Sequence, residues 1–206
     1  AATADSSAVA DGNRGVWHGG DRPSTSNVID FVTISVTGNA TDYGDLVAVR
    51  SHHGSCTNGH RGIAALDYPP AASPDIDYFA IGTIGNAVTF GNSFEDRPLW
   101  GDAGTDDGSR GVFMGGGAGP PNSNTIDYIN VGSLGDSSDF GNLNAGRGRA
   151  GAVSDGTKGV LGGGYTSPPA AYIDSKDLIS IGTLGTATDH NELSLARSEV
   201  ASTSGD

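Results

Sequence analysis

Three histidines and the only cysteine of the chain lie within the stretch HHGSCTNGH, which starts at His52. Imidazole and thiolate groups bind zinc and copper, so a metal site is the first chemistry to consider. His53 and His60 are seven residues apart, however, and an extended strand would separate them by roughly 20 Å. His52 and His53 are adjacent and would point to opposite sides of such a strand. We therefore predict no metal site here, and we expect Cys56 to be a small buried residue.

Carboxylates gather in two glycine-rich stretches, GNATDYGD at 38–45 and GTDDGS at 104–109. Calcium takes six to eight oxygen ligands, which alternating carboxylates can supply. Neither stretch has the spacing of an EF-hand loop, and aspartates that accept hydrogen bonds from their own turns explain the pattern more simply. The sequence predicts no cofactor, with calcium kept as the alternative.

Aspartate and arginine recur together along the chain, in four copies with a constant separation of 20 residues. The pairs are Asp30 and Arg50, Asp77 and Arg97, Asp127 and Arg147, and Asp177 and Arg197. A ring of repeats with one active site has no use for four copies of a catalytic pair. We interpret these residues as structural, forming ion pairs or hydrogen bonds to turns, and we assign no catalytic residue.

Other residues keep the same register, which makes the repeat about 48 residues long. Each aspartate is followed by a glycine after eight residues and, after 13, by a ring: Tyr43, Phe90, Phe140 or His190. A basic residue and a glycine precede it, at Arg14, Arg61, Arg110 and Lys158. The copies cover about 4–50, 51–97, 98–147 and 148–197, and we treat 1–206 as one domain or a segment of one.

The third copy predicts four strands, roughly at 103–107, 110–116, 125–132 and 138–144, separated by glycine-rich turns. Apolar residues occupy both faces of the strand at 125–132, as expected for a sheet covered on two sides. No stretch has a 3.6-residue apolar period, so we predict no helix. Four antiparallel strands in units of this length are typical of a β-propeller, so the predicted fold is all-β with four-stranded blades.

The same residues resemble kelch repeats. In the third copy the match runs through Arg97, the pair at 115–116, the stretch NTIDY at 124–128, Phe140, Leu143 and Arg147. Kelch blades carry tryptophan at the ring position, and the second copy lacks the double glycine, so the repeats are divergent members of the pattern. The resemblance implies a propeller, commonly of six or seven blades. More loosely, the stretch at 29–46 is similar to repeats in virion proteins of marine bacteriophages.

The last residues, SEVASTSGD at 198–206, align with the start of the first copy and predict the first strand of a fifth blade. Two readings stay open. The chain is a segment of a larger ring, closed by further blades or between chains, or a four-bladed ring carries one redundant strand.

Loop lengths vary between copies only where the second strand meets the third and where one copy passes to the next. Alternating strand directions place both kinds of connection on one face, which we call the loop face, and loops of variable length are where binding residues concentrate. The sequence predicts ligand-binding residues there, on aromatic rings and one histidine: Tyr68, Trp100, Tyr165, Tyr172 and His52.

The net charge is −13, which excludes nucleic acid as a partner because its binders need a basic surface. No apolar run approaches the ~20 residues of a membrane span. We expect a non-enzymatic structural or binding module, in extracellular or virion surroundings, that recognises a glycan or a protein and is assembled with other chains. The alternatives are a propeller enzyme acting on carbohydrate at the ring axis, as an oxidase, hydrolase or lyase, and an intracellular adaptor.

Overall fold

The computed structural model describes residues 4–21, 23–67, 74–95, 97, 103–117 and 121–201. They form four four-stranded antiparallel sheets, named sheets 1 to 4 in chain order, and a short hairpin. Sheet 1 comprises β1 (Ser7–Ala10), β2 (Arg14–His18), β3 (Ser26–Thr33) and β4 (Thr41–Arg50). Sheet 2 comprises β5 (Gly54–Thr57), β6 (Arg61–Ala65), β7 (Asp75–Ala80) and β8 (Val88–Asn92). Sheet 3 comprises β9 (Gly104–Asp106), β10 (Arg110–Met114), β11 (Thr125–Asn130) and β12 (Ser138–Asn142).

Sheet 4 comprises β13 (Gly151–Ser154), β14 (Lys158–Gly162), β17 (Ser175–Ser180) and β18 (Thr188–Glu192). The hairpin, β15 (Tyr165–Thr166) and β16 (Ala171–Tyr172), lies between β14 and β17 in the chain. The all-β class and the four strands per repeat are therefore as predicted, and the described residues hold no helix. No helix capable of crossing a membrane exists in this part of the chain.

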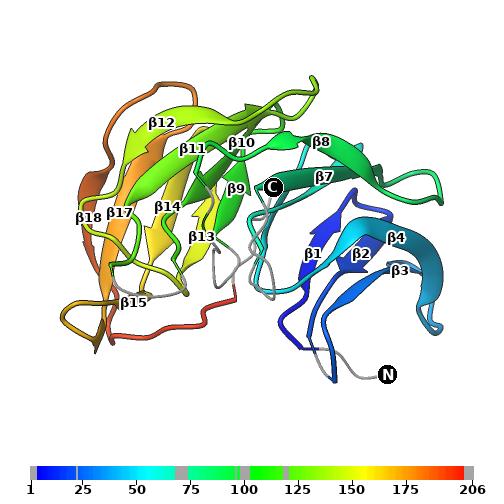
Figure 1. Ribbon diagram of the computed structural model, residues 1–206, viewed down its shortest axis with the longest axis horizontal. Helices are drawn as coiled ribbons and strands as arrows, with labels where there is room; N and C mark the ends of the chain where they lie inside the picture. Colours follow the sequence, from blue (N-terminus) through cyan, green and yellow to red (C-terminus); the bar gives the residue numbers. More distant parts are fainter. Residues whose placement is uncertain are drawn as a thin grey trace.

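The four sheets follow one another in an arc, with the first strand of each sheet on the inside (Figure 1). The inner strand β1 contacts β5, β5 contacts β9, and β9 contacts β13. Within the described residues the arc is open and does not close into a ring. Sheets 2 and 3 therefore have a neighbouring sheet on both faces. In the described residues, sheets 1 and 4 stand at the two ends of the arc, and each keeps one face uncovered.

Three strands of the third copy begin where the sequence predicts, β9 begins one residue later, and all four end one or two residues earlier. β10 ends at Met114 and β11 at Asn130, where glycines with a left-handed backbone or a tight turn follow. The sequence does not predict the hairpin of β15 and β16, because the segment that contains Tyr165 and Tyr172 is expected to be a loop. The sequence pattern thus located the sheets well and missed structure inside a loop.

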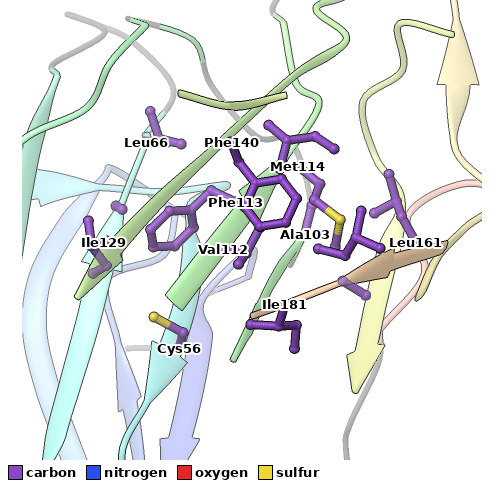
Figure 2. Close-up of a cluster of buried hydrophobic side chains, with 14 of the residues drawn as sticks. Cys56, Leu66, Ala103, Val112, Phe113, Met114, Ile129, Phe140, Leu161 and Ile181 are labelled. Carbon is purple, nitrogen blue, oxygen red and sulfur yellow. The ribbon is translucent and has the colours of Figure 1, made fainter. Parts of the chain in front are cut away.

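Alternating side chains of the third strand of a sheet face its two neighbours. In β11, Asp127 pairs with Arg97 of the second repeat, and Ile129 lies on the same side of the cluster as Cys56 (Figure 2). Leu161 and Ile181 of sheet 4 lie on the other side (Figure 2). Cys56 is 3% exposed, so the prediction that it is a small buried residue is confirmed. The apolar core is therefore a series of layers between sheets.

Glycines let the sheets approach closely at these layers. A Cβ at Gly44, Gly91 or Gly141 would lie less than 3.0 Å from the backbone of the next sheet. The amide of Gly85 donates to the carbonyl of Tyr43 at 3.0 Å, and Gly135 and Gly185 make the equivalent hydrogen bonds. Backbone hydrogen bonds therefore run between sheets as well as within them.

The second copy lacks the double glycine, but its backbone keeps the left-handed conformation that the first of these glycines adopts in the other copies. Leu66 has φ +62°, matching Gly19 at +66°, Gly115 at +70° and Gly163 at +69°. A left-handed conformation costs a residue with a Cβ about 1–2 kcal/mol. Leu66 is fully buried in the core, and the apolar area that it buries offsets that cost.

The predicted strand over 198–206 is not formed at 198–201, and 202–206 lie outside the described residues. A strand at this place would need a following strand as its partner, and none of the described residues provides one. The backbone nevertheless follows the course of a new repeat. Glu199 has φ +55°, as Asp5, His52 and Arg149 have at the same point of earlier copies (+56°, +52° and +59°).

The close approach of sheets 2 and 3 predicts that Gly91→Ala destabilises the protein. Its Cβ would collide with the backbone of Gly135, which cannot move aside as a flexible side chain could. We expect a loss of about 1–3 kcal/mol in the free energy of unfolding, measured by urea titration. Gly82→Ala is the matched control, because nothing lies within 4 Å of a Cβ there. Equal unfolding midpoints for the two variants would contradict the close approach.

Candidate binding face and the charged junctions

The loop face is built by hydrogen bonds between the two kinds of variable connection. The amide of Gly20 donates to the carbonyl of Arg50 at 2.8 Å, and Gly116 to Arg147 at 2.7 Å. Gly164 makes the equivalent bond to Arg197 at 2.7 Å. In each case the loop after the second strand meets the arginine that ends or follows the fourth strand. The two kinds of connection therefore share one end of the sheet, as the strand directions predicted.

Two of the predicted binding residues, Tyr165 and Tyr172, lie opposite each other on the hairpin of β15 and β16. Their ring centroids are 5.8 Å apart and the rings meet edge to face. Tyr172 is 63% exposed, whereas Tyr165 is half-buried. An exposed ring supported by a second ring forms a small apolar platform with two hydroxyl groups at its margin.

Neighbouring segments hold this hairpin in place. Tyr165 and Gly148 exchange two backbone hydrogen bonds, of 2.8 and 3.0 Å. The guanidinium of Arg149 lies 5.5 Å from the centre of the Tyr165 ring, and it pairs with Glu199 at 3.2 Å. The amide of Asn122 donates to the carbonyl of Ser167 at 3.3 Å, which ties the hairpin to sheet 3. The platform is thus fixed by contacts to the link between sheets 3 and 4 and to the loop between β10 and β11.

Of the other predicted binding residues, only His52 is described by the structure, and it is not brought to this platform. His52 lies in the link between sheets 1 and 2, with its Nε2 atom 3.5 Å from Asp5. Tyr68 and Trp100 lie outside the described residues. The described part of the predicted site therefore reduces to the tyrosine pair and, at a different sheet, His52.

The recurring arginines and aspartates meet between sheets. Arg50 pairs with Asp77, Arg97 with Asp127 and Arg147 with Asp177. All six side chains are at most 2% exposed. The arginine that ends one repeat therefore enters the next repeat and neutralises its aspartate.

Each of these arginines also donates to main-chain carbonyls of the repeat that it enters. Arg50 donates to Ala64 and Asp75, both at 3.2 Å, and its Nη2 atom lies 2.8 Å from Asp77. Burial raises the pKa of Asp77, and the nearby charge of Arg50 opposes that rise. Burial likewise lowers the pKa of Arg147 against the effect of Asp177. The pairs are desolvated, so each charge depends on its partner.

Asp30 and Arg197 occupy the same positions in the first and last repeats, and both are exposed. Among the described residues, neither takes part in an ion pair; the Nε of Arg197 donates to the carbonyl of its own neighbour Leu195 at 3.2 Å. The two ends of the arc therefore carry the two halves of a pair that is complete three times inside it.

A pair of buried histidines was missed by reasoning from the sequence. Nδ1 of His18 lies 2.8 Å from Nε2 of His53, and both residues are 1% exposed. Burial, with a smaller effect of Arg50, lowers the pKa of His18 to about 3. Burial also lowers the pKa of His53 well below its usual value, with His18 and Arg50 adding to the effect. The HHG motif drew attention to His53, but nothing in the sequence linked it to His18.

The stretch that suggested a metal site does not converge. His53 and Cys56 are buried, whereas His60 is exposed in the turn before β6. In the described residues no three histidine, cysteine or acidic side chains are grouped as metal ligands. Asp107 accepts hydrogen bonds from the amides of Ser109 and Arg110, at 2.9 and 2.7 Å, so its carboxylate caps its own turn.

A groove of about 950 Å³ runs along the inner strands of all four sheets. Most of its lining is small or main-chain, including Ala8, Ser55, Cys56 and Gly104. Two of its acidic residues cap turns: Asp11 accepts from the amides of Asn13 and Arg14, and Asp155 from those of Thr157 and Lys158. The groove offers room for a ligand, but these carboxylates are already used by the turns.

Comparisons with models of protein families and with curated proteins found no match to this chain. The kelch-like and virion-like resemblances stay predictions from the sequence, and what the chain can do has to be argued from its own geometry.

The buried pairs predict a large difference between two equivalent aspartates. Asp77→Ala leaves Arg50 buried without a counter-charge, which should cost about 3–5 kcal/mol of unfolding free energy. Asp30→Ala removes an exposed carboxylate and should cost less than about 0.5 kcal/mol. Urea titrations of both variants test this, with Asp77→Asn as a milder variant if Asp77→Ala does not fold. Similar losses at the two positions would show that the inter-sheet pair contributes little.

The buried histidines predict a loss of stability in mild acid. Below pH 6.5 the unfolded chain takes up protons at His18 and His53, but the folded protein resists protonation of His18 down to about pH 3. Stability should be complete above pH 6.5 and fall as the pH drops toward 3, by up to about 1.4 kcal/mol per pH unit for each histidine.

Unfolding free energies between pH 7 and pH 4.5 measure this slope. The variant His18→Gln/His53→Gln should have a shallower slope than the wild type, whereas His60→Gln, at an exposed position, should keep it. A double variant with an unchanged slope would rule out the histidine pair as its source.

Proposed function

We propose that the chain is a non-enzymatic binding module built on consecutive blades of a propeller-like arc, with its ligand site on the loop face. Four stacked four-stranded sheets with their inner strands along a common groove support the propeller reading. The observation that carries the binding role is the tyrosine platform, where a ring that is 63% exposed stands on a second ring. A large ring so exposed on a well-anchored hairpin is a feature of binding surfaces.

The ligand that fits this platform best is a neutral glycan. One face of a sugar ring is apolar enough to lie on Tyr172, while the hydroxyl groups around it need polar partners. The tyrosine hydroxyls and Arg149 supply such partners beside the ring. A protein surface is the other partner class, and the acidic character of the chain, with net charge −13, would favour a basic one.

We also propose that the module is displayed on a virion or a cell surface. The support is compositional, because acidic, lysine-poor surfaces keep their solubility where salt screens their self-repulsion. Labelling intact particles or cells of the source with an antibody against the chain would test this. Labelling that appears only after lysis would reject it.

The platform predicts a specific loss of binding in Tyr172→Ala. We expect at least about a tenfold weaker signal on an array of immobilised neutral oligosaccharides, because truncating a central aromatic hot spot costs about 2 kcal/mol or more. Leu184→Ala is the matched control: it removes a side chain that is 52% exposed, in the turn between β17 and β18 of sheet 4.

Binding that survives Tyr172→Ala would place the glycan site elsewhere. If the wild type binds no oligosaccharide, a pull-down with the same variants should show whether a protein is the ligand. Silence in both experiments would leave the chain as a scaffold only.

A further inference from the structure

The three junctions between consecutive sheets use one set of contacts. Besides the arginine–aspartate pair, a basic residue of one sheet donates to a main-chain carbonyl of the next: Arg14 to Ile81, Arg61 to Val131 and Arg110 to Ile181. A side chain of each inner strand also lies over a glycine of the next sheet: Val9 over Gly62, Cys56 over Gly111 and Thr105 over Gly159. The junction is thus a directional interface, with different partners on its two sides.

On the side of sheet 1 that carries Asp30, the described residues provide no neighbouring sheet, and the residues there are uncovered. Trp17 is 45% exposed and Ile34 is 56% exposed. Their counterparts in sheets 2 to 4 are all 0% exposed: Ala64, Phe113 and Leu161 for Trp17, and Ile81, Val131 and Ile181 for Ile34. This surface is the receiving half of a junction, and it is apolar around one carboxylate.

On the side of sheet 4 that carries Arg197, no neighbouring sheet is formed by the described part of the chain, and there the donating half is uncovered. Val153 is 38% exposed, whereas its counterparts Val9, Cys56 and Thr105 are at most 8% exposed. His190 and Arg197 are exposed, whereas the equivalent rings and arginines of sheets 1 to 3 are buried. The only two lysines of the chain, Lys158 and Lys176, also belong to strands of this sheet.

We propose that these two surfaces bind each other in different molecules, so that sheet 1 of one copy of this chain packs on sheet 4 of a second copy. Asp30 of one copy would pair with Arg197 of the other, repeating the three internal pairs. Val153 would lie over Gly15, and Lys158 would face the carbonyl of Ile34, as the arginines do inside the chain. The proposal does not depend on the proposed function, because it concerns the ends of the arc and not the loop face.

Complementary charge supports a second copy as the occupant. One surface offers a carboxylate amid apolar side chains, and the other offers guanidinium and ammonium groups, so two like surfaces would repel or leave a charge unpaired. The contact is therefore head to tail, and such an interface generates a ring if its rotation closes and a filament if it does not.

Three local differences make this junction weaker than the internal ones. Asn191 stands where the internal junctions have glycine, and its Cβ points at the place of the next sheet. Trp17 lies 3.2 Å from a Cβ built on Gly15, so its ring must swing away before Val153 can pack there. Val200 packs against Gly151, in the place that the inner strand of a docked copy needs, so the tail must move aside.

Charge reversal tests the proposal on the full chain. Sedimentation velocity over a concentration series should show concentration-dependent association of the wild type. Asp30→Arg and Arg197→Asp should each weaken association by at least about tenfold, because each sets like charges opposite one another. Mixing these two variants should restore association. A contact between unlike variants joins either the two reversed residues or the two unchanged ones, and the charges are opposite in both cases. Asp139→Arg, an exposed change on β12 with the same charge difference as Asp30→Arg, should leave association unchanged.

Asn191→Gly provides a gain-of-function arm, because it restores the residue of the internal junctions and should strengthen association. In a Trp100→Phe background, burial of Trp17 should also shift tryptophan emission to shorter wavelength as the concentration rises. A wild type that stays monomeric throughout the series would overturn the proposal. Association that ignores both charge reversals, or variants that fail to complement when mixed, would do the same.

Discussion

The buried arginine–aspartate pair between consecutive sheets is the contact on which the rest of the structure depends. An isolated buried charge is expensive, and burial already raises the pKa of Asp77 against the pull of Arg50. Neither residue can therefore stay in the layer without the other, so each repeat needs the last residue of the one before it. The pair fixes the direction in which repeats follow and the face that each sheet presents. Glycines such as Gly91 then let the backbones approach closely enough to form hydrogen bonds between sheets.

This constraint explains which parts of the repeat are fixed in length and which vary. The 20 residues from each aspartate to its arginine span the third and fourth strands, and a change there would move one charge out of reach of its partner. The loops of variable length lie outside this span, so their lengths can differ between copies without changing it. The hairpin of β15 and β16 is one such difference, and it carries the exposed Tyr172. A rigid layer structure thus leaves one face free to acquire a binding surface.

Much of this fold was predictable from the sequence, because periodic offsets report which residues are equivalent. They located four sheets, the burial of Cys56 and the loop face. They could not show which copies an arginine and an aspartate would join, since a constant offset is compatible with pairing inside or between repeats. The contact of His18 with His53 has no counterpart in other copies, so no repetition signalled it. The conformation of Leu66 was not predictable either, because only the structure shows that it adopts the left-handed backbone of the glycine at the same position in other copies.

A chain of such repeats has the physical difficulty that its two ends cannot be alike. Every internal junction buries one donating surface and one receiving surface, so an open arc leaves one of each exposed at its ends. Repeat proteins usually have polar residues on such end surfaces. Sheet 4 follows that rule, with His190 and Asn191 where ring and glycine stand elsewhere. Sheet 1 departs from it, because Trp17 and Ile34 remain exposed beside Asp30. Asp30 and Arg197 need no explanation on their own, since water solvates single charges well. The exposed apolar side chains do need an explanation. Burying them in a contact would favour association by more than the charged pair alone could.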